Sequence, residues 1–177
     1  MDNVNSFLVD WSIRFLENKD VIRKEIINIE KDKCNFTIRY KDKIGRFFVE
    51  PVLGDDIFNI LKNSKGISGP PKIAKRFSSE IKNEDYIGFI TLNNMANIKF
   101  VLSNWAKLIK FEFLSIYFIN PFSTSDKVWI IRPYIHDRIC DKASLELGLR
   151  SMAEMVNTIN VEEISRKIKL LGEESGL

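Results

Sequence analysis

The sequence has few of the side chains that metal centres and cysteine chemistry require. Its 177 residues include one histidine, His136, and two cysteines, Cys34 and Cys140. The cysteines are too few for a disulfide scaffold and belong to no C-x-x-C motif, so we expect free thiols. A structural zinc site usually takes four cysteine or histidine ligands, and with one histidine and no cysteine pair the chain does not match that requirement. We therefore expect no bound metal ion.

Long apolar runs are missing as well. The longest, FLSIYFI at residues 113–119, is much shorter than the roughly 20 residues of a membrane-spanning helix. The first residues, MDNVNSFLVDW, do not combine a basic stretch, an apolar stretch and a small-residue cleavage site as a secretory signal does. We expect a soluble, cytoplasmic protein that is not associated with a membrane.

Signatures of nucleotide binding and of serine hydrolases are also absent. The segment GISGPPK at 66–72 has glycines and a lysine, but not in the order G-x-x-x-x-G-K-[ST]. No G-x-G-x-x-G follows an expected strand, and the motif G-x-S-x-G does not occur. We therefore expect no cofactor, and the sequence gives no support to nucleotide-dependent catalysis.

What the chain does contain is the composition of an ordinary globular protein. Hydrophobic residues make up 45% of it and charged residues 29%, which argues against disorder and against a coiled coil. Its length suits one domain with a sizeable core, so we expect a single domain over residues 1–177. The 27 Lys and Arg residues exceed the 24 Asp and Glu residues by three. This mild excess permits an anionic partner without requiring one.

Hydrophobic spacing predicts both helices and strands. Apolar residues recur at helical spacing near the start, and three runs with strand-like alternation follow. Gly54, Asp55 and Asp56 offer an N-cap for a short helix. The expected segments are a helix at 4–18, strands at 25–30, 34–41 and 45–53, a helix after residue 56, a basic loop or linker at 64–83, a strand at 86–92, a helix at 95–110, strands at 113–119 and 127–135, and a C-terminal helical segment at 142–171.

The order of these segments predicts an α/β chain of the α+β class. The short turns between the three early strands predict an antiparallel meander. The apolar strands at 86–92 and 113–119 are separated by a helix, which suits a parallel β-α-β unit that is buried on both faces. We therefore expect a mixed β-sheet with an antiparallel N-terminal meander and flanking helices.

Two capping patterns mark the starts of the C-terminal helices. Asp141 precedes the apolar periodicity of the helix expected at 142–158. Asn160 is followed three residues later by Glu163, which resembles a capping box. The sequence thus predicts a helix start after each of Asp141 and Asn160.

The stretch KVWIIRPYIHDRICD at 127–141 concentrates the versatile side chains of the chain. Read as a strand, it alternates between a core face and an accessible face. Pro133 has no amide hydrogen to donate, so the strand is expected at a sheet edge or close to its end. The core face would carry Trp129, Ile131, Pro133, Ile135 and Ile139, and the accessible face Arg132, Tyr134, His136 and Arg138.

The accessible row suits an anionic partner. Arginine pairs bidentately with phosphate or carboxylate, tyrosine supplies a hydroxyl or a stacking ring, and histidine binds anions or moves protons. On a strand, Arg132 and Arg138 would lie ~20 Å apart, which fits a polyanion such as nucleic acid better than one phosphate. The basic loop at 64–83 adds a second set of possible contacts: Lys72, Lys75 and Arg76. In the alternative interpretation these residues face solvent and pair with carboxylates such as Asp126 or Asp137.

Three functions stay open on these residues. The first is a non-catalytic binding or accessory protein that holds an anionic partner such as nucleic acid on the Arg132–Arg138 row. The second is a small enzyme for a phosphate- or carboxylate-bearing substrate, with His136 as acid or base and Tyr134 or Asp137 assisting. The third is an assembly subunit or homo-oligomer that associates through the apolar positions of the helical segment at 142–171.

The early element order is similar to that of restriction-endonuclease-like nucleases. Their signature places an acidic residue on one strand and the motif E-x-K on the next. Here the third strand ends in Glu50, Pro51 and Val52, so the motif lacks its lysine. The similarity therefore covers element order alone and implies no nuclease activity.

Overall fold

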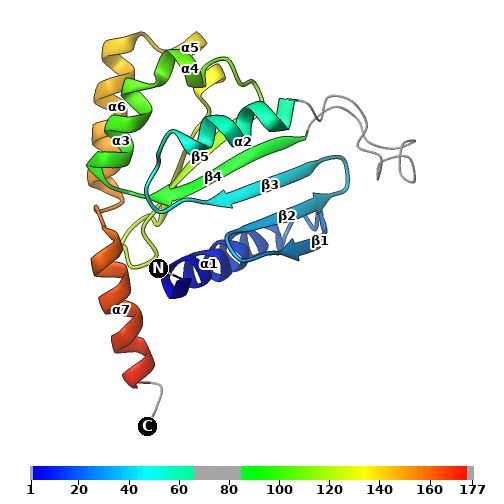
Figure 1. Ribbon diagram of the computed structural model, residues 1–177, viewed down its shortest axis with the longest axis vertical. Helices are drawn as coiled ribbons and strands as arrows, with labels where there is room; N and C mark the ends of the chain where they lie inside the picture. Colours follow the sequence, from blue (N-terminus) through cyan, green and yellow to red (C-terminus); the bar gives the residue numbers. More distant parts are fainter. Residues whose placement is uncertain (1, 66–84, 175–177) are drawn as a thin grey trace.

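The computed structural model describes residues 2–65 and 85–174 of the chain. Within these residues a six-stranded sheet lies between two layers of helices (Figure 1). The strands are β1 (Ile26–Lys31), β2 (Asn35–Tyr40), β3 (Ile44–Val49), β4 (Tyr86–Leu92), β5 (Leu114–Ile119) and β6 (Val128–Ile131). The helices are α1 (Asp2–Asp20), α2 (Asp56–Lys65), α3 (Met95–Ser103), α4 (Trp105–Leu108), α5 (Pro133–Ile139), α6 (Lys142–Met155) and α7 (Val161–Glu174).

The strands lie in the sheet in their order along the chain. β1, β2 and β3 pair antiparallel because the turns between them are too short for a crossover. β3, β4 and β5 pair parallel, with helices in the two connections, and β6 returns antiparallel to β5. This arrangement confirms the predicted mixed sheet with an N-terminal meander.

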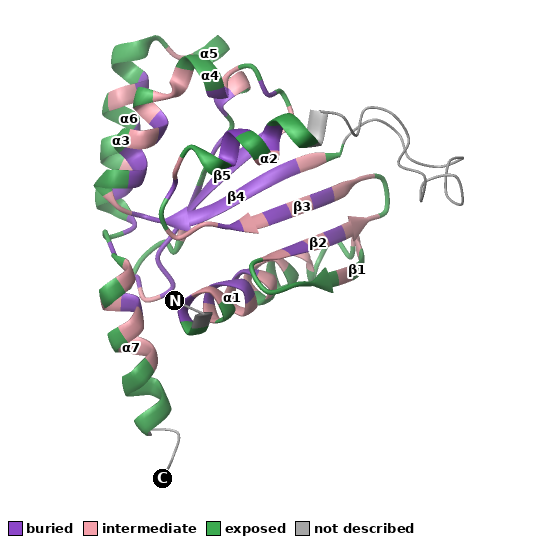
Figure 2. Cartoon of the chain, viewed as in Figure 1, coloured by how far each residue is buried: buried purple, intermediate pink, exposed green. Residues whose placement is uncertain are grey.

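Each face of the sheet has its own hydrophobic core. We call the face that packs against α2, α3 and α6 the α2 face, and the face that packs against α1 and α7 the α1 face. Every residue of β5 and all but the first of β4 are buried, whereas β1 is mostly exposed at the sheet edge (Figure 2). The largest fully buried side chains are Phe89 and Phe118 on the α2 face and Phe36 and Phe47 on the α1 face.

Two edges of the sheet matter for the sites described below. The amino edge is where the parallel strands β3, β4 and β5 begin, and the carboxyl edge is where they end. Because β6 is antiparallel, its last residue, Ile131, lies opposite Ile116 near the beginning of β5. Tyr40, the last residue of β2, lies beside the start of β3 for the same reason. α5 and the end of β2 are therefore both at the amino edge.

The strand predicted at 127–135 is wrong beyond Ile131. Pro133 occupies the first turn of α5, where its fixed φ and missing amide hydrogen are tolerated. The Arg132 carbonyl oxygen accepts from the amides of Ile135 and His136 at 3.1 and 2.9 Å, which closes the first helical turn. The predicted edge position is confirmed, because β6 is the last strand of the sheet.

The residues that were predicted to face the core also change their environment after Pro133. Trp129 and Ile131 are buried on the α2 face, and Trp129 stacks on Phe118 with ring centroids 4.1 Å apart. Ile135 and Ile139 were expected in the core but are 42% and 70% exposed, because the helix turns them away from the sheet. Strand alternation therefore ends where the strand ends.

The single helix predicted at 95–110 is divided at Asn104. The backbone amide and the side-chain amide of Asn104 both donate to the Phe100 carbonyl oxygen at 3.0 Å. These bonds satisfy the last turn of α3 and allow the chain to change direction before α4. The interruption follows from a local side-chain bond that competes with helix continuation.

Both predicted caps are confirmed. The Asp141 carboxylate accepts from the amides of Ala143 and Ser144 at 3.0 Å at the start of α6. At α7, Asn160 Oδ1 accepts from the Glu163 amide at 2.8 Å and Glu163 Oε2 accepts from the Asn160 amide at 3.3 Å. The sequence signatures therefore located both helix starts.

None of the helices in residues 2–65 and 85–174 is both long and apolar enough to cross a lipid bilayer.

Candidate functional site

The four residues predicted as one row lie on and just before a short helix. Residues four apart share a helix face, so the row divides into Arg132 with His136 and Tyr134 with Arg138. The expected separation of the two arginines along the chain axis falls from ~20 Å on a strand to about 9 Å on a helix. Lys72, Lys75 and Arg76 lie outside the described residues.

Arg138 is held against the ring of Tyr134. Its guanidinium carbon is 4.0 Å from the ring centroid, and its Nη2 donates to the Tyr134 hydroxyl. A hydrogen bond to the Glu112 carboxylate is the main cause that raises the pKa of Tyr134. The hydroxyl therefore stays protonated, and the stacked guanidinium is oriented at the surface before any partner arrives.

His136 is used locally to close the start of α5. Its Nδ1 is 2.8 Å from the carbonyl oxygen of Arg132 and 3.1 Å from the amide nitrogen of the same residue. One imidazole nitrogen is thus engaged with the backbone. Cys140, which ends the helix, is half-buried, and its amide donates to the His136 carbonyl oxygen. No contact of His136 in the described part of the chain favours the acid–base role over this local one.

Asp126 and Asp137 were expected to neutralise the arginines, but neither forms an ion pair with a described residue. Asp137 Oδ1 accepts from Trp105 Nε1 at 2.8 Å. Asp141 caps α6, and the hydrogen bond from the Ser144 hydroxyl is the main cause that lowers the pKa of Asp141. Neither Arg132 nor Arg138 forms an ion pair with a described residue; the ion pairs found there are Lys31–Asp10 and Arg150–Glu146.

At the carboxyl edge, the structure reveals a polar network that the sequence did not indicate. Asn93 donates to the carbonyl oxygens of Ala153 and Asn157 at 2.9 and 3.0 Å and accepts from Trp129 Nε1 at 2.9 Å. Asn120 also donates to the Asn157 carbonyl at 3.0 Å. The chain between α6 and α7 therefore closes the place where open parallel sheets usually bind ligands (Figure 1).

Asn97 completes this closure from the first turn of α3. Its Oδ1 accepts from the Leu53 amide at 2.9 Å, and its Nδ2 donates to Thr91 Oγ1, the Leu92 carbonyl and the Pro51 carbonyl. The side chain is 1% exposed. A buried side-chain amide whose oxygen and nitrogen both form hydrogen bonds within the protein has a structural role.

The amino edge is different because it contains an open hollow of about 340 Å³. We call it the amino-edge hollow. It is bounded by the end of α1, the turn into β1, the β2–β3 hairpin and the start of β4. Its lining residues are Leu16, Lys19, Asp20, Arg23, Glu25, Tyr40, Lys43 and Tyr86. Sequence reasoning missed these residues because four separate segments supply them and none carries a motif.

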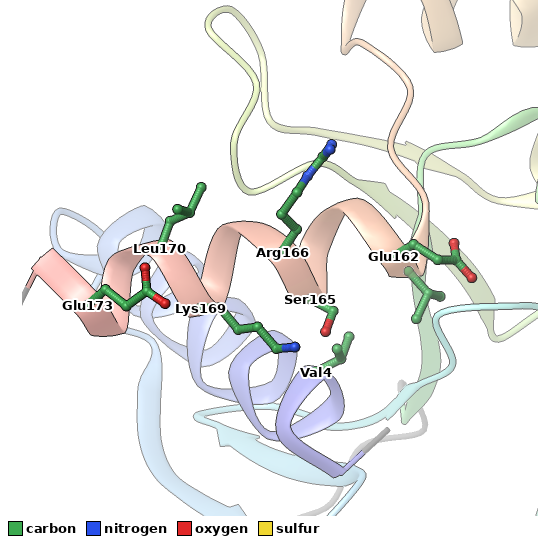
Figure 3. Close-up of a pocket in the computed structure, with 8 residues that line it drawn as sticks. Val4, Glu162, Ser165, Arg166, Lys169, Leu170 and Glu173 are labelled. Atoms are coloured by element: carbon green, nitrogen blue, oxygen red, sulfur yellow. The ribbon is translucent and has the colours of Figure 1, made fainter.

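A second hollow of about 550 Å³ lies between the first turn of α1 and one side of α7 (Figure 3). Lys169 reaches toward α1, whereas Arg166 points away from it. Glu162 and Glu173 on the same helix balance these two cations. The hollow is thus lined mainly by one helix with no net charge among its side chains.

Within residues 2–65 and 85–174, no group of three or more His, Cys, Asp or Glu side chains is placed to hold a metal ion. The most notable carboxylate pair is Glu50 at the end of β3 and Asp56 at the start of α2. Burial, and then the Asp56 charge, raises the pKa of Glu50. Two carboxylates without a third ligand do not define a metal centre.

Comparisons of the chain with protein-family models, with curated proteins and with solved structures found no match.

Proposed function

We propose that this chain is a non-catalytic binding protein that holds an anionic partner through Arg132 and Arg138. One observation carries the proposal. Both guanidinium groups are exposed and neither forms an ion pair among the described residues, while Asp137 and Asp141 of the same segment are bonded to other groups. Exposed arginines with no carboxylate partner are suited to phosphate, which they pair with bidentately.

Nucleic acid is the class of partner that fits this arrangement best. Two cations about 9 Å apart along the helix axis can contact different phosphates of one backbone. Arg138 is already oriented by the Tyr134 ring, so less conformational entropy is lost when it binds. Contacts of this kind position a backbone and do not read its sequence. We therefore expect salt-sensitive binding with little sequence preference.

The test compares two variants that lose the same charge. Arg132→Gln/Arg138→Gln removes the proposed contacts, and Arg14→Gln/Arg166→Gln removes two exposed arginines elsewhere that form no ion pair with a described residue. Fluorescence anisotropy with labelled single- and double-stranded DNA and RNA across a salt series measures affinity. We expect the first variant to bind at least about tenfold more weakly and to lower the salt slope by about two, because two phosphate contacts are lost.

The matched variant should keep nearly all of the affinity of the wild type. Equal losses in the two variants would mean that only net charge matters and that α5 is not the site. Absence of binding to every oligonucleotide at low salt would refute the nucleic-acid proposal.

A further inference from the structure

The amino-edge hollow is separate from the arginines of the proposed function and has its own set of cations. Lys43 Nζ lies 5.7 Å from the centroid of the Tyr40 ring, and Lys19 Nζ lies 4.9 Å from the centroid of the Phe15 ring. Arg23 is exposed on the turn after α1. None of these three cations is in an ion pair with any residue the structure describes. Two of them are instead held by aromatic rings.

The carboxylates of the hollow do not neutralise these cations by direct contact. Both oxygens of Asp20 accept backbone amides, from Glu25 at 3.1 Å and from Ile26 at 2.8 Å. Asp20 thereby closes the turn that joins α1 to β1. Glu25 is half-buried at the rim and is the second acidic residue of the lining. Three cations against two carboxylates leave the hollow with an excess of one positive charge.

The hollow also presents a hydroxyl that can donate. The Tyr86 hydroxyl donates to the Tyr40 hydroxyl at 3.1 Å, so the hydrogen of Tyr40 is available for another acceptor. Tyr86 is held in place by its close contacts with Gly45 and with the Phe47 ring. A Cβ on Gly45 would lie 2.7 Å from Tyr86 Cζ, and the Phe47 ring meets Tyr86 edge-on at 5.6 Å. Packing thus positions Tyr86, and the hydrogen bond from Tyr86 in turn positions the Tyr40 hydroxyl.

The same packing keeps these hydroxyls protonated. Burial is the main cause that raises the pKa of Tyr40 and of Tyr86, and it raises the pKa of Tyr117 beside them to about 12. A tyrosine with a raised pKa is a poor base at neutral pH, but it remains a hydrogen-bond donor. The two tyrosines of the hollow are therefore hydrogen-bond donors rather than bases for proton abstraction.

We propose that the amino-edge hollow binds a phosphate group, with Tyr40 donating through its hydroxyl and Lys43, Lys19 and Arg23 supplying positive charge. These donors come from α1, the turn after it and the β2–β3 hairpin, so they approach from several sides. Such an arrangement suits the tetrahedral oxygens of phosphate, whereas a flat carboxylate matches one planar fork. The volume of about 340 Å³ leaves room for a group larger than phosphate attached to it.

The test is an amide NMR titration of the wild-type chain with inorganic phosphate, against sodium chloride at equal ionic strength. Lys43→Met and Tyr40→Phe each remove one proposed contact. Lys41→Met removes the same charge two residues away, at an exposed position outside the hollow. We expect saturable shifts at the hollow in the wild type. Lys43→Met and Tyr40→Phe should each bind phosphate about tenfold more weakly, because each loses a contact with the charged ligand. Lys41→Met should bind phosphate as the wild type does.

Two results would overturn the proposal. One is the absence of saturable shifts at the hollow with phosphate. The other is that Lys43→Met and Tyr40→Phe bind phosphate as tightly as Lys41→Met does. Thermal unfolding of each variant well above the temperature of the titration shows that loss of the fold is not the cause. Arg132→Gln/Arg138→Gln should retain phosphate binding at the hollow, so failure of either proposal can be told from failure of the other.

Further arms of the titration identify where the phosphate comes from. A 5′-mononucleotide represents a small phosphate ester, and a single-stranded oligonucleotide without terminal phosphates represents a nucleic-acid backbone. If the mononucleotide alone competes with inorganic phosphate at the hollow, the ligand is a small molecule. If the oligonucleotide competes and its binding falls in Lys43→Met, the hollow holds the backbone of a nucleic acid.

Discussion

The two edges of the parallel strands use polar side chains in opposite ways. At the carboxyl edge, Asn93 and Asn97 are fully buried, and their amide groups bond to the α6–α7 connection, to Trp129 and to backbone groups. At the amino edge, Tyr40 and Lys43 border an open hollow, and the guanidinium of Arg132 has no ion pair among the described residues. Open parallel sheets usually bind ligands at the carboxyl edge. In this protein the tertiary structure fills that edge and leaves the other open.

The difference shows how a structural polar residue can be told from a binding residue. Residue type does not separate them, because amides and hydroxyls serve both roles. Burial and internal satisfaction do separate them: a buried group whose hydrogen bonds are all made has nothing left for a ligand. An accessible donor or cation with no internal acceptor retains that capacity. The comparison therefore predicts large effects on stability at the carboxyl edge and effects on binding at the amino edge.

The largest effect on stability is expected for Asn97→Ala. The substitution leaves the Leu53 amide without its acceptor in the interior and opens a space under Pro51. An unsatisfied buried group and a cavity together should lower the free energy of unfolding by about 3 kcal/mol. Urea unfolding measures this loss. The control Asn28→Ala removes an exposed amide that is bonded to Glu30 on the same strand, and it should change stability by less than about 0.5 kcal/mol.

If Asn97→Ala were as stable as Asn28→Ala, the carboxyl edge would not be closed by satisfied bonds. The contrast between the two edges would then be lost.

A smaller loss is expected where aromatic rings cross the centre of the α1 face. A Cβ on Gly88 would lie 2.6 Å from the Phe47 ring and 3.1 Å from the Tyr117 ring. Overpacking in Gly88→Ala should cost about 1–3 kcal/mol in thermal or urea unfolding. Gly148→Ala is the matched control, because nothing lies within 4 Å of a Cβ at that exposed position of α6. It should stabilise the chain by about 0.5–1 kcal/mol.

A neutral Gly88→Ala would contradict the packing described for the rings that support the amino-edge hollow. A destabilised Gly148→Ala would contradict the open space at that position of α6.

The effect expected of the tyrosines is small at neutral pH and grows at alkaline pH. Because burial raises the pKa of Tyr86 above its ordinary value of 10.0, the folded chain keeps a proton that the unfolded chain loses at alkaline pH. The free energy of unfolding should therefore fall as pH rises above about 10, by about 1.4 kcal/mol per pH unit for each such tyrosine. Urea unfolding of wild type and Tyr86→Phe at several alkaline pH values measures the slope.

In Tyr86→Phe the free energy of unfolding should fall less steeply with pH, because the folded and unfolded chains then differ by one fewer tyrosine proton. Equal slopes would show that Tyr86 titrates normally and that its hydroxyl is not kept as a donor. At neutral pH the two proteins should differ by the hydrogen-bonding of the Tyr86 hydroxyl to Tyr40 and Tyr117, about 1 kcal/mol.

Local signals in the sequence account for most of the fold. Alternation in the β2 strand and the short turns on either side of it indicated the meander, and the apolar β4 and β5 strands indicated parallel pairing. Asp141 and Asn160 located helix starts because a cap acts within three residues of its own position. Interactions of such short range leave their pattern in adjacent residues, where sequence analysis can find them.

The error at Arg132–Arg138 has a local cause too. A proline ends a strand and also begins a helix, so Pro133 was compatible with both interpretations. Alternating residue types continued past it by coincidence. The candidate residues kept their chemistry but changed their relative positions, from one row to two pairs on a helix.

The amino-edge hollow lay beyond sequence reasoning altogether. Its residues come from segments as far apart as Leu16 and Tyr86, and none of them is unusual in its own segment. What joins them is the parallel pairing of β3 with β4, which brings Tyr86 opposite Gly45 and within reach of Tyr40. The asparagines of the carboxyl edge were missed for the same reason, because their partners lie up to 64 residues away.

The sequence by itself determined most of the order of helices and strands, the two capped helix starts and the supply of arginine, lysine and tyrosine, since propensity, alternation and capping act between close neighbours. Only the tertiary structure decided which of those polar groups are satisfied inside and which stay available. That decision depends on strand pairing and on the path of the α6–α7 connection, which bury Asn93 and leave Tyr40 at an open hollow. Availability for binding is a property of long-range packing, and no single segment of the chain contains it.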